Sequence, residues 1–318
     1  MKILVTPTSL QPDKNPEALR TLQNFTSDLV FNTTGKPLEE DALLSLLKDC
    51  DGYLAGLDFV TEKVLASCPK LKAISRYGAG YDRVDLHAAF AQGIVVTNTP
   101  GVNAQAVGEL AFALLLSIAR KIPYLNAQTQ SGAWIRSTGT ELKGKTIGIM
   151  GLGAIGKVVA RCASGFGMKI QAYDPYIDKT YCKEHGIHTA DFSEVLRSSH
   201  AISLHLPLTS ATKHLMGADA IAQMLPGAIL INTSRGGIID EAAAYDALIT
   251  GQLGGLGLDA FEVEPPLFSP LFSLTNVVTT PHTGAHTQEA VAQMASLSVD
   301  NLIAVLTNAP CPYIIQPQ

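Results

Sequence analysis

Three ionisable side chains each follow a short apolar run in the second half of the chain. Arg235 comes after "AILINTS", Glu264 after "GLGLDAFEV", and His282 after "NVVTTP". The guanidinium group of an arginine can bind a carboxylate through two parallel hydrogen bonds. Histidine exchanges a proton near neutral pH, and a nearby glutamate favours its imidazolium form. These three side chains suit the reduction of a ketone beside a carboxylate, with His282 as the general acid, or as the base in the reverse oxidation.

A glycine motif lies upstream of these residues. The segment "KTIGIMGLGAIGKVVARCASGFGMKIQAYD" contains Gly151, Gly153 and Gly156 as G-x-G-x-x-G, between a predicted strand and a predicted helix. Gly151 allows a tight turn, Gly153 lets the backbone approach a pyrophosphate, and Gly156 lets the helix pack closely on the strand. Because a helix N-terminus offers free N–H groups to phosphate oxygens, we predict a dinucleotide-binding loop.

Asp174 ends the strand that is predicted after this helix. Its carboxylate would accept hydrogen bonds from the adenosine ribose and repel a 2′-phosphate, which favours NAD over NADP. Two alternatives are a turn that binds no ligand and a P-loop, since "GLGAIGKV" also matches G-x-x-x-x-G-K. A P-loop needs a serine or threonine where this chain has Val158, so nucleotide hydrolysis is disfavoured.

Short apolar runs alternate with helical patterns along the chain, which indicates parallel sheets covered by helices. The predicted strands are 2–5, 53–55, 71–75 and 94–97, and then 145–150, 168–174, 201–208, 227–234, 254–260 and 276–282. We predict a long helix that begins after Asn103 and stops at Pro123, and another at 287–306 that returns the chain to its first domain. The fold class is therefore α/β, with a Rossmann NAD-binding domain at 100–286 and a discontinuous flavodoxin-like substrate domain at 1–99 and 287–318.

Composition excludes several classes of protein. The net charge is −5, without the basic run that nucleic-acid binding requires. Charged residues make up 16% of the chain, below the usual quarter, which favours burial of surface between identical subunits. The longest apolar stretch is too short for a membrane span, and the five scattered cysteines are typical of a reduced cytoplasmic protein. His282 and His286 have no third metal ligand beside them, so we predict no metal.

Six segments in order resemble the D-2-hydroxyacid dehydrogenase family, including its phosphoglycerate dehydrogenase branch. They are "SRYGAGYDRVDL", "NTPGVNAQAVGELAFALLLSIAR", "ELKGKTIGIMGLGAIG", "NTSRGGIIDE", "LDAFEVEPP" and "PHTGAHT". The resemblance implies NAD as cofactor, a homodimer built on the nucleotide domain, and catalysis by Arg235, Glu264 and His282. Besides the three glycines, the expected cofactor contacts are Ile155, Asp174, Thr233 and Asp259, together with His205, Pro207 and Thr212 from "HLPLTSAT".

The same resemblance implies that the loop of Tyr77, Gly78, Ala79 and Gly80 binds the substrate carboxylate, in a cleft between two domains that close and exclude water. Arg83 departs from the family, which often has asparagine there. It is either a solvated surface arginine or a residue that alters the anchoring of the loop or the choice of anion.

Several questions of function stay open at the level of sequence. The candidate substrates are 3-phosphoglycerate and the pair hydroxypyruvate and glyoxylate. The candidates for binding a substrate phosphate are Arg76 and Arg83. We expect no appended regulatory domain. The alternatives are an NAD(H)-sensing corepressor-like protein, and a formate or phosphite dehydrogenase on the same scaffold.

Overall fold

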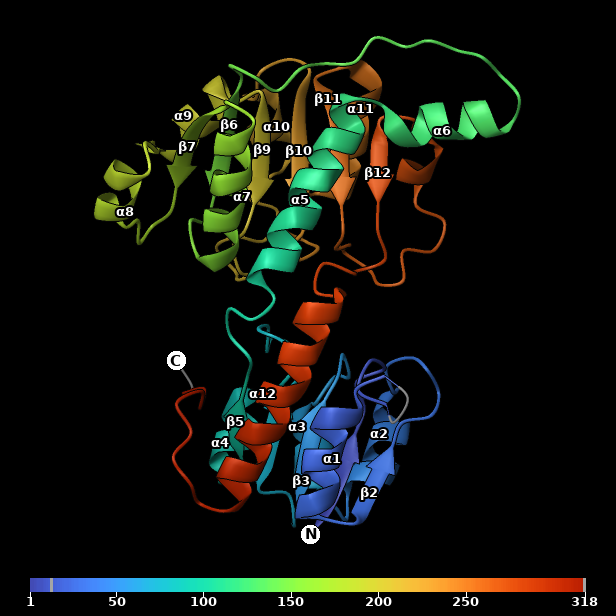
Figure 1. The fold of residues 1–318 in the computed structure, drawn as a ribbon, viewed down its shortest axis with the longest axis vertical. Coiled ribbons are helices and arrows are strands. Elements are labelled where there is room, and N and C mark those ends of the chain that lie inside the picture. The colour runs from blue at the N-terminus through green and yellow to red at the C-terminus, as the bar shows by residue number, and fades with distance from the viewer. Residues whose placement is uncertain (12–13, 317–318) are drawn as a thin grey trace. The chain divides into compact units, whose positions relative to one another are not determined.

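The computed structural model describes residues 1–11 and 14–316, which form two compact units. The first unit comprises Met1–Asn103 and Ala285–Gln318, and the second comprises Ala104–Gly284. Each unit is built around one parallel sheet (Figure 1). The predicted α/β fold class with two parallel-sheet domains is confirmed.

The sheet of the first unit has five parallel strands in the order β2-β1-β3-β4-β5, the flavodoxin-like arrangement. The strands are β1 (Lys2–Val5), β2 (Asp28–Phe31), β3 (Gly52–Ala55), β4 (Ala73–Arg76) and β5 (Val95–Thr97). The helices are α1 (Pro16–Phe25), α2 (Glu40–Leu47), α3 (Glu62–Ala66), α4 (Leu86–Ala91) and α12 (Gln288–Leu306). The four predicted strands are present, whereas β2 was missed because this edge strand is only partly buried and has a weak apolar signal.

Helix α12 brings the end of the chain back to the first unit, as predicted. It packs against α1, β3, β4 and β5, and Ala295, Val299 and Leu302 are buried there. By length and composition α12 could cross a membrane, but nearly half of its apolar window is buried within this unit. The helix is therefore a core element of the first unit.

The sheet of the second unit has seven parallel strands in the order β12-β11-β10-β9-β6-β7-β8. From β8 to β11 this is the strand order of a doubly wound dinucleotide-binding fold. The strands are β6 (Thr146–Met150), β7 (Lys169–Tyr173), β8 (His188–Thr189), β9 (Ala201–Leu204), β10 (Ala228–Asn232), β11 (Leu253–Leu258) and β12 (Val277–Thr279). The helices are α5 (Ala104–Ala119), α6 (Ile122–Gln130), α7 (Ala154–Gly165), α8 (Lys179–Glu184), α9 (Phe192–Ser198), α10 (Ala218–Ala222) and α11 (Glu241–Thr250), with a 3-10 turn at Pro270–Ser273.

The prediction that Pro123 stops the long helix is wrong. Helix α5 ends at Ala119, Lys121 adopts a left-handed conformation with φ of 53°, and Pro123 lies in the first turn of α6. Proline is tolerated there because the first N–H groups of a helix have no intrahelical partner. Helix α6 has no buried residue, so no apolar periodicity marked it in the sequence.

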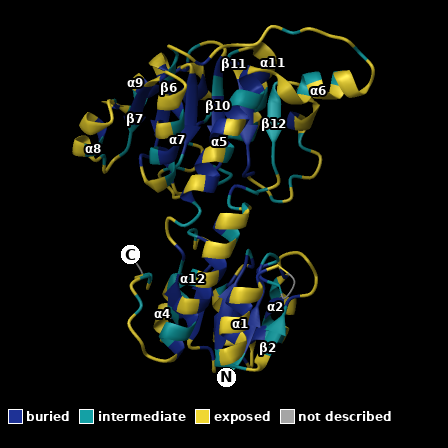
Figure 2. Ribbon diagram, in the orientation of Figure 1, coloured by how far each residue is buried: buried dark blue, intermediate teal, exposed yellow. Residues whose placement is uncertain are grey.

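Each unit has two clusters of buried apolar side chains, as is usual where helices cover both faces of a parallel sheet. Figure 2 shows that most strand residues are buried. Fully buried side chains include Leu4 and Ile74 in the first unit and Ile149, Leu204 and Leu230 in the second. With both faces filled, the carboxyl ends of the strands are the edge where loops can carry functional side chains.

Candidate active site

The glycine loop between β6 and α7 has the geometry of a phosphate cradle. Gly151 has φ of 94°, and a Cβ there would overlap the carbonyl group of His205. A Cβ at Gly156 would overlap the carbonyl oxygen of Gly151. Around a Cβ at Gly153, the described residues beyond its immediate chain neighbours place no atom within 4 Å. Gly151 and Gly156 therefore fix the shape of the turn. Gly153 leaves room beside the first turn of α7, and Ile155 lies in that first turn. A pyrophosphate fits this arrangement.

Asp174 lies directly beside this loop. One carboxylate oxygen accepts a hydrogen bond from the N–H of Leu152 at 2.8 Å, and the other from the N–H of Tyr176 at 2.8 Å. The half-buried carboxylate is therefore held at the end of β7 next to the glycine turn. This is the position that hydrogen bonds to a cofactor ribose require.

Two buried polar atoms at the ends of β9 and β10 have no partner among the described residues. They are Nδ1 of His205 and Oγ1 of Thr233. Buried polar groups almost always have a partner, so these atoms fit a bound dinucleotide that would supply one. Nε2 of His205 contacts the hydroxyl of Ser203 at 2.9 Å. Burial lowers the pKa of His205 to about 3, so its imidazole is neutral at physiological pH.

The loop after β9 is held by its own side chains. The hydroxyl of Thr212 donates a hydrogen bond of 2.6 Å to the carbonyl of Pro207. Pro207 is exposed and Thr212 half-buried, so both lie at the surface beside His205. Their assignment as cofactor contacts stays a prediction.

His282 and Glu264 are brought together from two neighbouring strands. Nδ1 of His282 lies 2.8 Å from Oε1 of Glu264, which also accepts a hydrogen bond from the N–H of Phe261 at 3.3 Å. The side chains retain 31% and 21% of their accessible surface, so both reach solvent while touching each other. A carboxylate on Nδ1 fixes the orientation of the ring and leaves Nε2 to act on a substrate.

Asp259 holds the loop that carries His282. Its buried carboxylate accepts hydrogen bonds from the hydroxyl of Thr280 at 2.6 Å and from the N–H groups of Thr283 and Gly284 at 2.8 Å each. His282 has φ of 52°, which is uncommon for a residue other than glycine and needs such support. This anchoring role was missed from the sequence, which predicted Asp259 as a cofactor contact; that role stays a prediction.

The turn that carries Arg235 is fixed by Asn232 and Ser234. The Asn232 side chain donates to the carbonyl of Arg235 at 2.7 Å and accepts from the N–H of Ser234 at 3.0 Å. The Ser234 hydroxyl donates to the carbonyl of Leu204 at 2.6 Å, which ties β10 to β9. Arg235 itself is half-buried, and its guanidinium donates to the carbonyl of Ser234 at 2.8 Å.

The Arg235 turn and the Glu264 segment are packed against each other. A Cβ at Gly236 would overlap the carbonyl group of Phe261. Since β10, β11 and β12 are neighbours, the predicted trio follows three adjacent strands. The structure thus joins Glu264 to His282 directly, and it joins the turn of Arg235 to the segment of Glu264 through Gly236.

In the first unit, the loop from Tyr77 to Gly80 follows β4, and the carbonyl groups of Gly78 and Ala79 accept hydrogen bonds. The carbonyl of Gly78 accepts from the N–H of Thr99 at 3.1 Å, and the N–H of Gly78 donates to the Thr99 hydroxyl at 3.1 Å. The side chain of Asn98 donates to the carbonyl of Ala79 at 2.7 Å. Within residues 1–11 and 14–316, the N–H groups of Ala79 and Gly80 donate no hydrogen bond. These amides are therefore available to an anion such as a carboxylate.

The two arginines nominated for phosphate binding make internal contacts. Arg76 is buried, and its Nη1 donates to the carbonyls of Ala55 at 3.0 Å and Tyr77 at 2.7 Å. Arg83 donates to the carbonyl of Leu57 at 2.7 Å and lies 4.7 Å from the centre of the Phe59 ring. Of the two interpretations of Arg83, these contacts favour loop anchoring.

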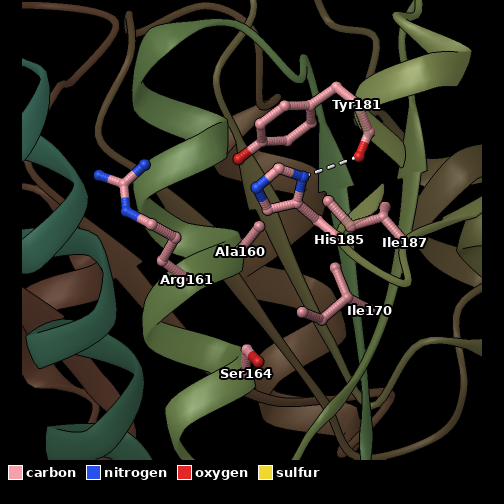
Figure 3. Close-up of a pocket in the computed structure, with 7 residues that line it drawn as sticks. All are labelled: Ala160, Arg161, Ser164, Ile170, Tyr181, His185 and Ile187. Carbon is pink, nitrogen blue, oxygen red and sulfur yellow. Dashed lines mark hydrogen bonds between the residues drawn. The ribbon is translucent and has the colours of Figure 1, made fainter. Parts of the chain in front are cut away.

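A small pocket in the second unit is lined by none of the predicted site residues. Figure 3 shows the residues that line it. Its volume is about 140 Å³, and its lining residues are Ala160, Arg161, Ser164, Ile170, Tyr181, His185 and Ile187. The rings of Tyr181 and His185 stack with their centres 3.9 Å apart. The pocket borders the second half of α7, whereas the glycine loop precedes that helix.

The sequence pattern of a known family covers more than half of the chain. Residues 112–284 match the NAD binding domain of the D-isomer specific 2-hydroxyacid dehydrogenases. The chain belongs to this family. As a D-2-hydroxyacid dehydrogenase, it is an oxidoreductase that binds NAD and acts on the CH–OH group of 2-hydroxy acids. The family predicted from the six sequence segments is confirmed.

Among similar proteins, a glyoxylate reductase of Thermococcus litoralis is 45% identical over 85% of this chain and 81% of its own length. A D-3-phosphoglycerate dehydrogenase of Methanocaldococcus jannaschii is 41% identical over 85% of this chain, but over only 52% of its own length. The chain thus spans about half of that relative. The D-lactate dehydrogenase of Escherichia coli, solved without ligand, is 30% identical, with a TM-score of 0.86 over 99% of this chain and 100% of the other.

Proposed function

We propose that this D-2-hydroxyacid dehydrogenase reduces a small unphosphorylated 2-oxo acid, glyoxylate or hydroxypyruvate, with NADH. The contact of 2.8 Å between Glu264 and His282 carries the assignment of the chemistry, because it supplies an oriented proton donor at the edge of the sheet that bears the glycine loop. The internal contacts of Arg76 and Arg83 support an unphosphorylated substrate. The similarity to a glyoxylate reductase supports the same choice.

In the proposed mechanism, NADH supplies the hydride when it is bound. His282 donates the proton of Nε2 to the developing alkoxide, and Glu264 on Nδ1 orients the ring. Arg235 binds oxygen atoms of the substrate through its guanidinium, which polarises the carbonyl and sets its orientation. The amides of Ala79 and Gly80 bind the substrate carboxylate, with Tyr77 and Gly78 completing that loop.

We infer the cofactor contacts from the features that fit a dinucleotide. Gly151, Gly153, Ile155 and Gly156 would bind the pyrophosphate, and Asp174 the adenosine ribose. Oγ1 of Thr233 and Nδ1 of His205 are buried without a hydrogen-bond partner among the described residues, and they would bind the cofactor. Asp259, Pro207 and Thr212 complete the proposed set.

We also propose that the protein is a cytoplasmic homodimer formed through its second unit. Helix α6 has no buried residue, and the segment after it exposes Trp134 by 84% and Ile135 by 47%. Ile122, at the start of α6, is exposed by 52%. Large exposed apolar side chains along one segment of the chain suit an interface between subunits.

The test is NADH oxidation by the purified protein with glyoxylate, hydroxypyruvate, 3-phosphohydroxypyruvate, pyruvate and 2-oxoglutarate. We expect the highest kcat/KM with glyoxylate or hydroxypyruvate. His282→Ala should lower kcat by roughly 100-fold or more while the Kd for NADH, measured by fluorescence titration, stays unchanged. Preference for the phosphorylated acid would contradict the proposed substrate. Binding of NADH without turnover of any acid would favour the alternative of an NAD(H)-sensing corepressor-like protein.

A further inference from the structure

The turn that carries Glu264 is joined to helix α11 by an acidic side chain. The N–H of Glu262 donates a hydrogen bond of 2.7 Å to Oε1 of Glu241, the first residue of α11. Val263, the next residue, is 71% exposed and adds little packing. The bond to Glu241 therefore restrains this segment two residues before Glu264.

The bond between the two segments is reciprocal. The N–H of Glu241 donates a hydrogen bond of 3.0 Å to Oε1 of Glu262, while Asp240 caps the same helix by accepting from the N–H of Ala243. Carboxylates are favoured at a helix N-terminus because its N–H groups lack intrahelical partners and carry partial positive charge. The pair thus resembles a capping box formed between two distant segments.

His214 connects the pair of Glu241 and Glu262 to the turn that carries Arg235. Nε2 of His214 lies 3.3 Å from Oε1 of Glu262, and the N–H of His214 donates to the carbonyl of Gly237 at 2.7 Å. Gly236, between Gly237 and Arg235, packs on Phe261. The segments before Glu264 and after Arg235 are therefore fixed to the same end of α11.

We propose that Glu241 and Glu262 are positioning residues for the reaction: as a reciprocally bonded pair they hold the Glu264 turn against α11 and keep the Glu264 carboxylate on His282. Neither side chain belongs to the proposed catalytic trio. The expected effect on turnover rests on the proposed function. The restraint of the Glu264 turn by the pair does not depend on it.

The restraint of the Glu264 turn is measured by hydrogen exchange of backbone amides in the full-length protein. This measurement needs no substrate. In Glu262→Ala and Glu241→Ala, amides of residues 259–264 should exchange faster than in the wild type. Glu194→Ala is the matched control, because Glu194 contacts His188 at 3.0 Å on the surface of the same unit. It should leave exchange in 259–264 unchanged. Unchanged exchange in the Glu262 and Glu241 variants would overturn the proposal.

The consequence for catalysis is measured as separate kcat and KM values. Each alanine variant should lose between about 10- and 100-fold in kcat, because a misplaced Glu264 no longer orients His282, while the KM for NADH stays within about two-fold. Glu262→Gln and Glu241→Gln keep the accepting oxygen and should retain most of the wild-type kcat. The thermal midpoint of each variant shows whether the fold is intact.

The outcomes separate this proposal from the proposed function. Faster exchange with an unchanged kcat in an active enzyme would overturn the positioning role. Glutamine variants as slow as the alanine variants, with exchange restored to the wild-type rate, would also overturn it. A wild type that turns over none of the acids would contradict the proposed function, and exchange would still decide whether the pair holds the turn.

Discussion

At the scale of single residues, two carboxylates of the second unit act through backbone amides. Asp174 binds the N–H groups of Leu152 and Tyr176, and Asp259 binds those of Thr283 and Gly284. Such bonds are strong because the acceptor is charged. The sequence predicted Asp174 as a cofactor contact because it ends a strand, and the family resemblance implied the same role for Asp259, but neither showed which backbone groups these carboxylates bind.

Asp174 should determine the choice of cofactor. Asp174→Ala removes the charge that repels a 2′-phosphate and the acceptor that fixes Leu152. We expect the ratio of kcat/KM for NADH to that for NADPH to fall by roughly 10-fold or more, which corresponds to about 1.4 kcal/mol. Initial rates with each cofactor at saturating glyoxylate measure this ratio.

Asp219→Ala is the control for this substitution, because Asp219 is an exposed carboxylate in the first turn of α10. It should not alter the cofactor ratio. An unaltered ratio in Asp174→Ala would remove Asp174 from cofactor selection.

At the scale of elements, the sequence predicted the strands whose side chains are buried. Strands β4, β9 and β10 are apolar runs, and their burial explains the signal. Strand β8 was missed because its two residues, His188 and Thr189, are exposed. A hydrophobic pattern arises because side chains are buried. Strands and helices that are exposed therefore give only a weak pattern in the sequence.

The close packing of two elements at Gly236 should be intolerant of any side chain. Gly236→Ala would push the Arg235 turn away from Phe261, because the added Cβ overlaps that carbonyl group. We expect the free energy of unfolding to fall by roughly 1–3 kcal/mol and kcat to fall by more than 10-fold. Urea unfolding and steady-state kinetics measure the two effects.

Gly165→Ala is the matched control, since no atom lies within 4 Å of a Cβ at the end of α7. Its stability should be equal to that of the wild type or slightly higher, because alanine restricts the unfolded chain. Wild-type kcat in Gly236→Ala would show that the two loops need not be packed together.

At the scale of the whole molecule, the chain has a low content of charge and an apolar segment exposed on the second unit. We predict a dimer that depends on Trp134, which is 84% exposed. Trp134→Asp should shift the protein to the monomer by placing a charge in the interface. Sedimentation velocity at micromolar concentration measures the distribution of species.

Phe90→Ser is the control, because Phe90 is 66% exposed on α4 of the first unit, outside the proposed interface. That variant should remain a dimer. A monomeric wild type, or a dimer that Trp134→Asp leaves intact, would contradict the proposed interface.

The sequence by itself determined the fold class, and it predicted the glycine loop and the trio of Arg235, Glu264 and His282. It could do so because burial sets the apolar pattern and because loops after parallel strands meet at one edge. Only the tertiary structure decided that His282 contacts Glu264, that Asp259 binds the His282 loop, and that Glu241 and Glu262 bind each other. Such contacts join residues far apart in the chain, and their distances depend on how strands and loops pack in three dimensions.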